Sequence, residues 1–439
     1  MSSGLNLTAQ LINVNFFHEG EMMKQSILKK FGWLSAIVLV LVLFGASFAS
    51  AKDVVRFRTT DYSPSVTGPY FKALVKAFNE SQYGIEVVNE HIAWGDAMQK
   101  LNSELQARTQ PDISIVATRW LIDFQKDDVL APLENLMDPA FEAAFVPTFF
   151  NLQKYKGHLF ALPVAASARA MFYNETLLKK ANAKVPTTWD ETLAVAKKID
   201  ALGSDISGIC IQGAEIDAEA YYFYALWTHG GDLFNADGTS AIASSAAIKA
   251  AKVMNSFVKA GVAQKGVNSY SRGKCEEAFR TGKIGIVLTG PWFNNAIKKD
   301  GAKGVKYGIS ALPKGSSGAA SYGVTDSLVM FKDSKVKESA MKFLEFAFNH
   351  ENRVQFNKNE GFIPVMNSVI NDPVFTSNKR LAPFLEMGKV AKFVPLVPSW
   401  EEMADHIKTA MQDVYAGKKS AKDALSGAAK KIDRLMKNQ

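Results

Sequence analysis

The sequence contains few of the residues and patterns that mark metal sites and enzymes. Among 439 residues it has two cysteines, which excludes a small disulfide scaffold and a zinc ribbon. The Gly-x-Ser-x-Gly, Gly-x-x-x-x-Gly-Lys-Ser/Thr and His-Glu-x-x-His patterns are absent. Carboxylates are abundant, so a glycosidase pair stays open, although no pattern marks one. We therefore expect no catalytic residue, no metal and no cofactor.

Long runs of one charge are also missing. The formal net charge is +8, from 51 Lys and Arg against 43 Asp and Glu, and the excess is spread thinly along the chain. This pattern indicates a solvated surface, and we expect no nucleic-acid partner. A hydrophobic content of 47% is typical of a globular protein. At about 150 residues per domain, the length predicts two or three lobes.

An apolar segment near the N-terminus is typical of a secretory signal peptide. We assign the signal to residues 23–51, where three lysines precede an apolar run at 36–44 and small residues end at Ala51. A membrane anchor is the alternative, but the apolar core at 33–48 is shorter than the ~20 residues that a spanning helix needs. Cleavage after Ala51 predicts a mature chain in the periplasm. We interpret residues 1–22 as the product of a start codon assigned too early.

Strand and helix patterns alternate along the mature chain. Period-two or buried apolar runs predict strands at 54–59, 84–90, 112–117, 208–213, 284–288, 308–312 and 327–331. Amphipathic spacing predicts helices at 69–80, 94–107, 218–229, 244–260 and 335–349, and short helical pieces broken at Gly417 and Gly427 over 400–437. This order favours α/β sheets with helices on their faces.

The two cysteines, Cys210 and Cys275, are 65 residues apart by numbering. In an oxidising compartment they can pair if the fold brings them together. Because Cys210 lies in an apolar, strand-like run, we favour two buried free thiols.

Tryptophans give the clearest indication of a binding site. Trp292, Trp400, Trp120 and Trp227 lie beside turn signals or strand ends. A ring at the carboxyl end of a strand points into the crevice where α/β sheets bind ligands. Sugars pack their C–H faces on aromatic planes, so these rings favour a carbohydrate site. Trp189 is the exception, since it begins a helix after a capping threonine, and we assign it to structure.

Several ordered blocks along the mature chain resemble one known family. They are 110–113 (QPDI), 171–174 (MFYN), 185–191 (VPTTWDE), 278–286 (AFRTGKIGI), 289–292 (TGPW), 337–346 and 360–365 (EGFIPV). Together they resemble the bacterial extracellular solute-binding proteins of carbohydrate ABC transporters, the family 1 class that includes maltose-binding protein. The resemblance covers essentially all of the chain from residue 52 onward.

The resemblance implies an α/β fold of the periplasmic-binding-protein type II-like kind. Two α/β lobes are joined by a multi-crossing hinge, with the ligand cleft between them. The implied crossings lie near Pro163, 324–325 and 361–364. The implied lobes are 52–163 plus 326–361 for the first, and 164–325 plus 362–439 for the second.

The resemblance also implies ligand-binding residues. Trp292 and Trp400 match sugar-stacking aromatics of the second lobe, and Arg119 and Trp120 match a polar stretch of the first lobe. Ser167 stands where maltose-type members carry an acidic contact, which argues against maltose itself. The remaining candidates are Tyr62, Trp94, Trp227, His229 and Asp326.

The implied function is the substrate-binding component of an ABC importer. It is a monomer that captures a small-molecule carbohydrate and delivers it to the transmembrane subunits of the ABC permease, and it is not an enzyme. The same fold with a sugar phosphate, a sugar acid, a polyamine or ferric iron is the alternative, with Tyr221 and Tyr222 as the pair that iron would need. A secreted polysaccharide-acting enzyme is the rival from another class.

Overall fold

The computed structural model describes residues 52–215, 217–300 and 305–438. The predicted signal peptide at 23–51 and the residues 1–22 before it lie outside this described part. No described helix is long and apolar enough to cross a membrane.

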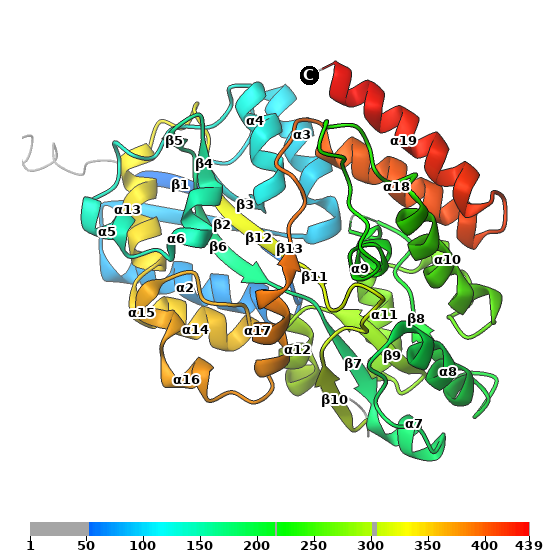
Figure 1. Cartoon of the computed structure of the whole chain (residues 1–439). Coiled ribbons are helices and arrows are strands. Elements are labelled where there is room, and N and C mark those ends of the chain that lie inside the picture. The colour runs from blue at the N-terminus through cyan, green and yellow to red at the C-terminus, as the bar shows by residue number, and fades with distance from the viewer. Residues whose placement is uncertain (1–51, 216, 301–304, 439) are drawn as a thin grey trace, which may run out of the picture. The chain divides into compact units, whose positions relative to one another are not determined.

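A five-stranded sheet forms the centre of the first lobe, with strand order β2-β1-β3-β12-β6 (Figure 1). Its strands are β1 (Asp53–Asp61), β2 (Ile85–Ala93), β3 (Ile113–Ala117), β6 (Ala161–Ser167) and β12 (Val324–Met330). β1 runs parallel to β3, whereas β12 is antiparallel to both β3 and β6. Every residue of β3 is buried, because helices cover both faces of the sheet.

The helices of this lobe supply much of its core. The longer ones are α2 (Thr67–Ser81), α3 (Ala97–Ala107), α13 (Lys337–Ala347) and α14 (His350–Glu360). Shorter elements are α4 (Leu121–Lys126), α5 (Pro139–Ala143), α6 (Pro147–Phe150), β4 (Lys154–Tyr155) and β5 (His158–Leu159), with 3-10 turns at Trp94–Asp96, Thr118–Trp120 and Asn151–Gln153.

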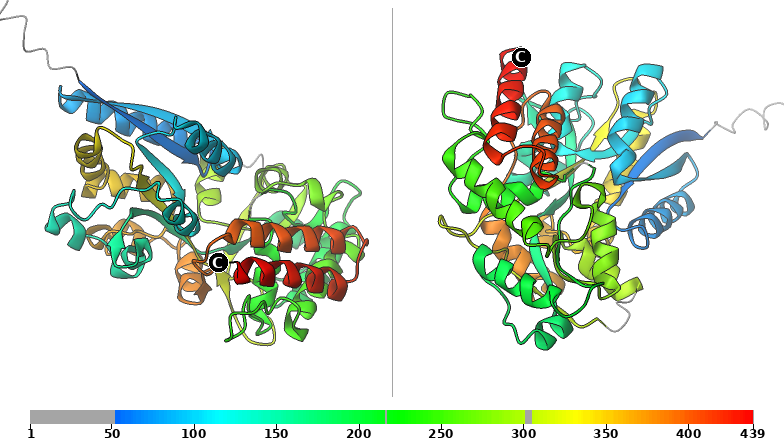
Figure 2. Two further views of the ribbon diagram at one scale, coloured as in Figure 1. Left: turned by 90° about the horizontal axis from the view of Figure 1, so that it is seen from above. Right: turned by 90° about the vertical axis from the view of Figure 1, so that its right-hand side faces the viewer.

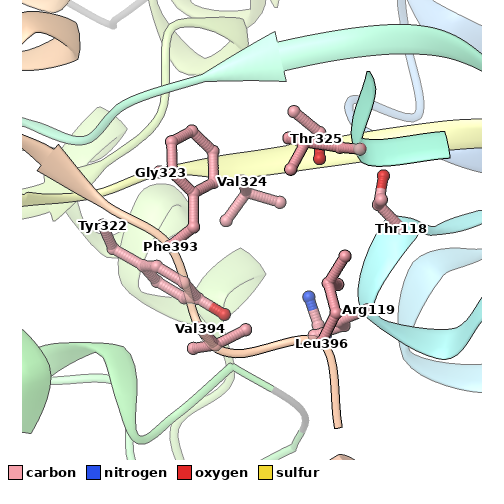
Figure 3. Close-up of a pocket in the computed structure, with 10 residues that line it drawn as sticks. Thr118, Arg119, Tyr322, Gly323, Val324, Thr325, Phe393, Val394 and Leu396 are labelled. Atoms are coloured by element: carbon pink, nitrogen blue, oxygen red, sulfur yellow. The ribbon is translucent and has the colours of Figure 1, made fainter. Parts of the chain in front are cut away.

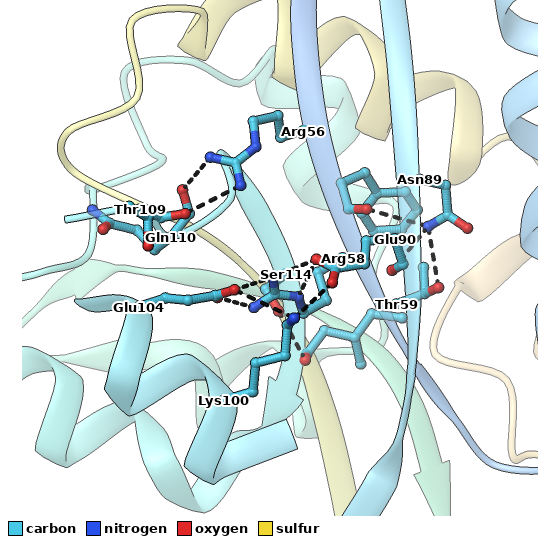
Figure 4. Close-up of polar contacts among 12 residues, drawn as sticks. Arg56, Arg58, Thr59, Asn89, Glu90, Lys100, Glu104, Thr109, Gln110 and Ser114 are labelled. Carbon is cyan, nitrogen blue, oxygen red and sulfur yellow. Dashed lines mark hydrogen bonds and ion pairs between the residues drawn. The ribbon is translucent and has the colours of Figure 1, made fainter. Parts of the chain in front are cut away.

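A buried arginine ties three elements of the first lobe together (Figure 4). Arg58 of β1 is 1% exposed. Its Nε donates to Glu90 Oε2 of β2 over 3.1 Å, and its Nη2 donates to Glu104 Oε1 of α3 over 2.7 Å. A buried guanidinium needs such partners, so this ion-pair network has a structural role.

A four-stranded sheet forms the centre of the second lobe, in the order β10-β7-β9-β8. Its strands are β7 (Ala170–Asn174), β8 (Ser207–Cys210), β9 (Ile284–Thr289) and β10 (Tyr307–Ser310). Around it lie α7 (Glu175–Lys180), α8 (Trp189–Asp200), α9 (Ala220–Thr228), α10 (Ser245–Lys259), α11 (Arg272–Arg280) and α12 (Trp292–Asp300), with a 3-10 turn at Val267–Ser269. β8 and β9 are parallel, and the other pairings are antiparallel.

The C-terminal helices α18 (Trp400–Tyr415) and α19 (Ala421–Lys437) pack on each other and on α10 (Figures 1 and 2). The predicted break at Gly417 is confirmed, since α18 ends just before it. The predicted break at Gly427 is wrong, because α19 runs through that glycine. Before α18 come α15 (Asn367–Ile370), α16 (Pro373–Thr376), α17 (Ala382–Lys389) and β13 (Ala391–Lys392).

The chain passes between the two sheets at short links. Ala168 and Arg169 connect β6 to β7, and Gly323 connects β11 (Ser321–Tyr322) to β12. β11 pairs with β13, and a Cβ at Gly323 would lie 2.7 Å from the Phe393 ring, so only glycine fits there. The predicted first crossing, Pro163, lies inside β6, so the strands place this crossing a few residues later, at Ala168 and Arg169. The lobe boundaries themselves remain a prediction.

Two local predictions have clear outcomes. Thr188 caps α8, because its side chain accepts a hydrogen bond from the Glu191 amide. Trp189 is buried, and its Nε1 donates to Thr228 Oγ1 over 2.9 Å, which fits its predicted structural role. The expectation of free thiols is wrong, because a disulfide joins Cys210 of β8 to Cys275 of α11.

Candidate ligand-binding site

Side chains from both lobes meet around Arg119. This residue lies in the turn Thr118–Trp120 at the carboxyl end of β3. Its Nη2 lies 3.0 Å from Asp217 Oδ1, just before α9, and its Nε donates to Glu401 Oε1 in the first turn of α18. Trp120 Nε1 donates to the same Glu401 oxygen over 2.8 Å. Arg119 and Trp120 of the first lobe therefore contact two acidic residues of the second lobe, Asp217 and Glu401.

Burial and charge pairing control the ionisation of this group. Burial alone would lower the pKa of Arg119, but the carboxylates of Glu401 and Asp217 outweigh it and raise that pKa. Burial likewise opposes ionisation of Asp217, yet Arg119, Arg169 and Arg272 hold its pKa below the usual value. Both partners are therefore charged at neutral pH.

Two neighbouring carboxyls, unlike Asp217, have pKa values above the usual range. Burial raises the pKa of Asp326 on β12 to about 7, with Arg119 opposing the shift and Asp217 adding to it. Burial and the charge of Asp217 raise the pKa of Glu219 to about 8. Near neutral pH these carboxyls hold protons for part of the time, so they can donate as well as accept hydrogen bonds.

Aromatic rings border the same charges. Trp94 stacks on Trp120, with ring centroids 5.6 Å apart and an angle of 22° between the ring planes. The ring centroid of Tyr62 lies 5.9 Å from that of Trp94. On the second lobe, Trp292 donates from Nε1 to Glu276 Oε1 over 3.0 Å. The Arg169 guanidinium lies 4.7 Å from the Trp292 ring centroid.

Several buried polar atoms at this site have no hydrogen-bond partner of standard geometry within the described residues. They are Tyr62 Oη, Trp94 Nε1, Tyr322 Oη and Asp326 Oδ1, of which Tyr62 faces Asp326 and Trp94 faces Asp217. Such atoms are few in folded proteins, because each unsatisfied group costs roughly 1–3 kcal/mol. Donors and acceptors of a bound hydroxylated ligand would satisfy them.

Two pockets adjoin Arg119 and Glu401. One, of about 1120 Å³, lies between α3 and the start of α18, and its lining includes Gly95, Glu219 and Glu401. The other, of about 340 Å³, is lined by Thr118, Arg119, Tyr322 and Phe393, among others (Figure 3). Each pocket is lined by residues of both lobes, and Arg119 lines the smaller one.

The predicted ligand-binding residues fall into two groups. The first group lies close together around Arg119 and consists of Tyr62, Trp94, Arg119, Trp120 and Asp326. Arg169 connects Trp292 and Ser167 to this group, since its guanidinium lies over the Trp292 ring and its Nη1 donates to Ser167 Oγ over 2.7 Å. Trp227 and Trp400 pack on Phe223 in the second core, with ring centroids 5.3 and 6.3 Å away. His229 is held by the Ala225 carbonyl. Their roles in ligand binding remain predictions.

Sequence reasoning missed much of the charge at this site. It did not select Arg169, Asp217, Arg272, Glu276 or Tyr322. One signal was available: Arg272 and Glu276 are four residues apart, which places them on one face of α11. Their contact with Trp292 depends on tertiary packing, which no local pattern shows.

Comparison with known proteins identifies the family. The family described as bacterial extracellular solute-binding protein matches residues 63–354. The chain belongs to this family. A Brucella abortus protein named as a binding protein is 40% identical over 407 residues, covering 92% of this chain and 98% of that protein. The galactooligosaccharide-binding protein of Bacillus subtilis is 25% identical over 372 residues, covering 82% of this chain and 84% of that one.

Solved structures of solute-binding proteins show the fold. An ABC substrate-binding protein of Listeria monocytogenes in complex with cycloalternan has a TM-score of 0.79 and 20% identity, covering 88% of this chain and 99% of that one. A solute-binding protein of Thermotoga lettingae bound with α-D-tagatose has a TM-score of 0.80 and 22% identity, covering 88% and 100%. The predicted type II-like fold of this solute-binding protein is therefore confirmed.

Proposed function

We propose that this solute-binding protein captures a carbohydrate between its lobes and delivers it to the membrane permease of an ABC importer. The observation that carries the proposal is a set of buried polar atoms that make no hydrogen bond of standard geometry within the described residues and lie beside aromatic rings, with both lobes contributing. Carbohydrates combine apolar C–H faces with many hydroxyls, so they match rings and planar polar groups placed together. Similar proteins named above bind or carry oligosaccharides and a sugar, which supports this ligand class.

Capture would proceed by closure of the two lobes around the ligand. Arg119 and Trp120 supply the first lobe's contacts to Glu401, and the links at Arg169 and Gly323 are where a hinge would bend. Closure needs a ligand that binds the closed arrangement more tightly than the open one. A sugar that contacts Tyr62 and Asp326 on one side and Trp292 on the other meets this requirement.

The remaining assignments follow from the family. Extracellular solute-binding proteins act outside the cytoplasmic membrane, which supports a periplasmic monomer released from a signal ending at Ala51. The lobes are proposed as 52–163 plus 326–361 and 164–325 plus 362–439, with the first crossing moved to the link at Ala168 and Arg169. The family binds solutes rather than converting them, which supports a non-enzymatic role. For ferric iron, Tyr221 is a poor ligand, because its hydroxyl donates to the Leu288 carbonyl inside the second core.

A thermal-shift screen of residues 52–439 tests the proposal. The panel contains neutral mono- and oligosaccharides, sugar acids, sugar phosphates, polyamines and ferric iron. A ligand that binds only the native state raises the melting temperature by mass action. We expect a rise with a carbohydrate, lost in Trp292→Ala and kept in Tyr83→Ala, a control whose ring is 89% exposed. A rise with iron or a polyamine alone contradicts the carbohydrate assignment.

A further inference from the structure

Two arginines beside Trp292 lack a carboxylate partner. The guanidinium carbons of Arg169 and Arg272 lie 4.7 and 4.9 Å from the Trp292 ring centroid. Neither arginine forms an ion pair within 4.0 Å in the part of the chain that the structure describes. Arg169 is only 5% exposed, and a buried cation without a counter-ion is costly.

None of the nearby acids among the described residues forms a direct ion pair with these two arginines, although Asp217 interacts with both through charge, and Glu215 and Glu276 interact with Arg272 in the same way. The charges of both arginines help to lower the pKa of Asp217, but the direct ion pair of Asp217 is with Arg119. Glu276 is turned to Trp292 Nε1 and Thr289 Oγ1, from which it accepts hydrogen bonds of 3.0 and 2.6 Å. Burial raises the pKa of Asp326 to about 7 and that of Glu219 to about 8, which weakens the negative charge of these two carboxyls at neutral pH. Burial also raises the pKa of Glu276, with the charge of Arg272 opposing the shift.

Hydrogen bonds within the protein hold Arg169 in place. Its amide donates to Ser321 Oγ over 2.9 Å, and its carbonyl accepts from the same hydroxyl over 3.0 Å. Its Nη1 donates to Ser167 Oγ. On α11, the Arg272 amide donates to Glu215 Oε1 over 2.8 Å. The backbones that carry the two guanidiniums are therefore anchored, one at the link between the sheets and one at the start of a helix.

We infer that the bound carbohydrate carries an anionic oxygen group, a carboxylate or a phosphate ester, which Arg169 and Arg272 bind beside Trp292. This inference rests on the proposed carbohydrate function and narrows its ligand class. Guanidinium groups bind carboxylate and phosphate oxygens through paired, charge-assisted hydrogen bonds. A neutral sugar would supply no charge to the buried Arg169, which has no direct ion pair among the described residues.

Calorimetric titration with matched probes tests the inference. The probes are glucose and galactose, their uronates, their 6-phosphates, neutral maltose and inorganic phosphate. We expect a uronate or a 6-phosphate to bind at least about tenfold more tightly than its neutral parent, in line with the strength of hydrogen bonds to charged groups. The uronate and phosphate arms tell the two anionic groups apart. Inorganic phosphate that binds as tightly as the sugar phosphates contradicts the inference.

Variants assign the effect to the two arginines. Arg169→Gln and Arg272→Gln should each weaken binding of the charged probe by about 10- to 100-fold, with little change for its neutral parent. Arg272→Lys should retain part of the affinity, because it keeps the charge but loses the planar fork. Arg108→Gln is the control, since Arg108 is exposed in the first lobe. Unchanged melting temperatures without ligand will show that the variants are folded.

The outcomes separate the inference from the proposed function. Neutral sugars that bind as tightly as their charged counterparts overturn the inference and leave the carbohydrate function standing. A preference for charged probes that survives both glutamine variants also overturns it. A complete absence of binding by charged and neutral carbohydrates contradicts both.

Discussion

Trp120 Nε1 donates a 2.8 Å hydrogen bond to Glu401 Oε1, which joins the turn after β3 to the first turn of α18. The same oxygen accepts from Arg119 Nε. One carboxylate on the second lobe therefore holds two neighbouring side chains of the first. Under the proposed closure, Glu401 is a contact between the two lobes.

Replacing Glu401 by alanine should favour the open arrangement. The change removes both hydrogen bonds and leaves the buried Arg119 with Asp217 alone. Because the ligand must then supply more of the closure energy, we expect its affinity to fall by about tenfold or more. Calorimetric titration measures the affinity, and small-angle X-ray scattering without ligand should show a larger radius of gyration.

The matched control is Glu402→Ala in the same helical turn. Its side chain is 59% exposed, and its ion-pair contact within the described residues is His406, 3.9 Å away. Equal effects of Glu401→Ala and Glu402→Ala on affinity would argue against the closure role of Glu401.

Removing the disulfide should destabilise the second lobe. Cys210 and Cys275 close a long loop, so Cys210→Ala with Cys275→Ala should lower the free energy of unfolding by about 2–4 kcal/mol. Urea titration measures this, with and without a reductant. The reductant should weaken the native protein to a similar extent and leave the double variant unchanged. Because Cys275 lies between Arg272 and Glu276 on α11, ligand affinity should also fall. Identical unfolding curves for both proteins would contradict this prediction.

Glu360 should make stability depend on pH. This carboxyl is fully buried at the end of α14, and burial raises its pKa to about 8, with the Thr67 hydroxyl opposing the shift and Asp61 adding to it. The folded protein therefore keeps this proton to a higher pH than the unfolded chain does. Its contribution to stability is complete below the unfolded pKa, near about 4.3, and is lost as the pH rises through about 8.

Glu360→Gln keeps the neutral shape and removes the titration. We expect a smaller loss of unfolding free energy between about pH 5 and about pH 9 than in the unmodified protein. Glu351→Gln, an exposed position on the same helix, should retain the full pH dependence. The prediction fails if the Glu360 and Glu351 variants show the same slope.

Trp189 should contribute to stability and not to binding. Its ring is buried against Phe257, and its Nε1 bonds Thr228. Trp189→Ala should lower the free energy of unfolding by about 3–5 kcal/mol through cavity formation. Below its lowered melting temperature, the variant should bind ligand with nearly unchanged affinity. A large loss of affinity in folded Trp189→Ala would place the residue in the site after all.

Strands and helices with strong local patterns were predictable from the sequence. The apolar runs of β3 and β9 were placed within a residue, because buried strands need continuous apolar residues. The pair β6 and β7 was missed. The first of these strands contains Pro163, which is unfavourable in a strand interior, and the chain passes directly from one sheet to the other without a turn signal.

The binding site was predictable only where it lies next to a strand end. Trp120 and Arg119 follow β3 in sequence, so their position pointed to a crevice. Asp217 and Arg169 come from separate loops, and only tertiary folding brings them to Arg119 and Trp292. The disulfide was missed for the same reason, since the apolar setting of Cys210 fits a buried bond as well as a buried thiol.

A crystal structure of residues 52–439, with the carbohydrate that gives the largest thermal shift, tests the central claim most directly. We expect a sugar between the lobes, in contact with Tyr62 or Asp326 of the first lobe and with Trp292 of the second. Hydrogen bonds with the ligand should include the Tyr62 hydroxyl or the Asp326 carboxyl, whose Oη and Oδ1 make no hydrogen bond of standard geometry within the described residues. A ligand bound outside the cleft, or held by one lobe alone in a closed protein, would contradict the account.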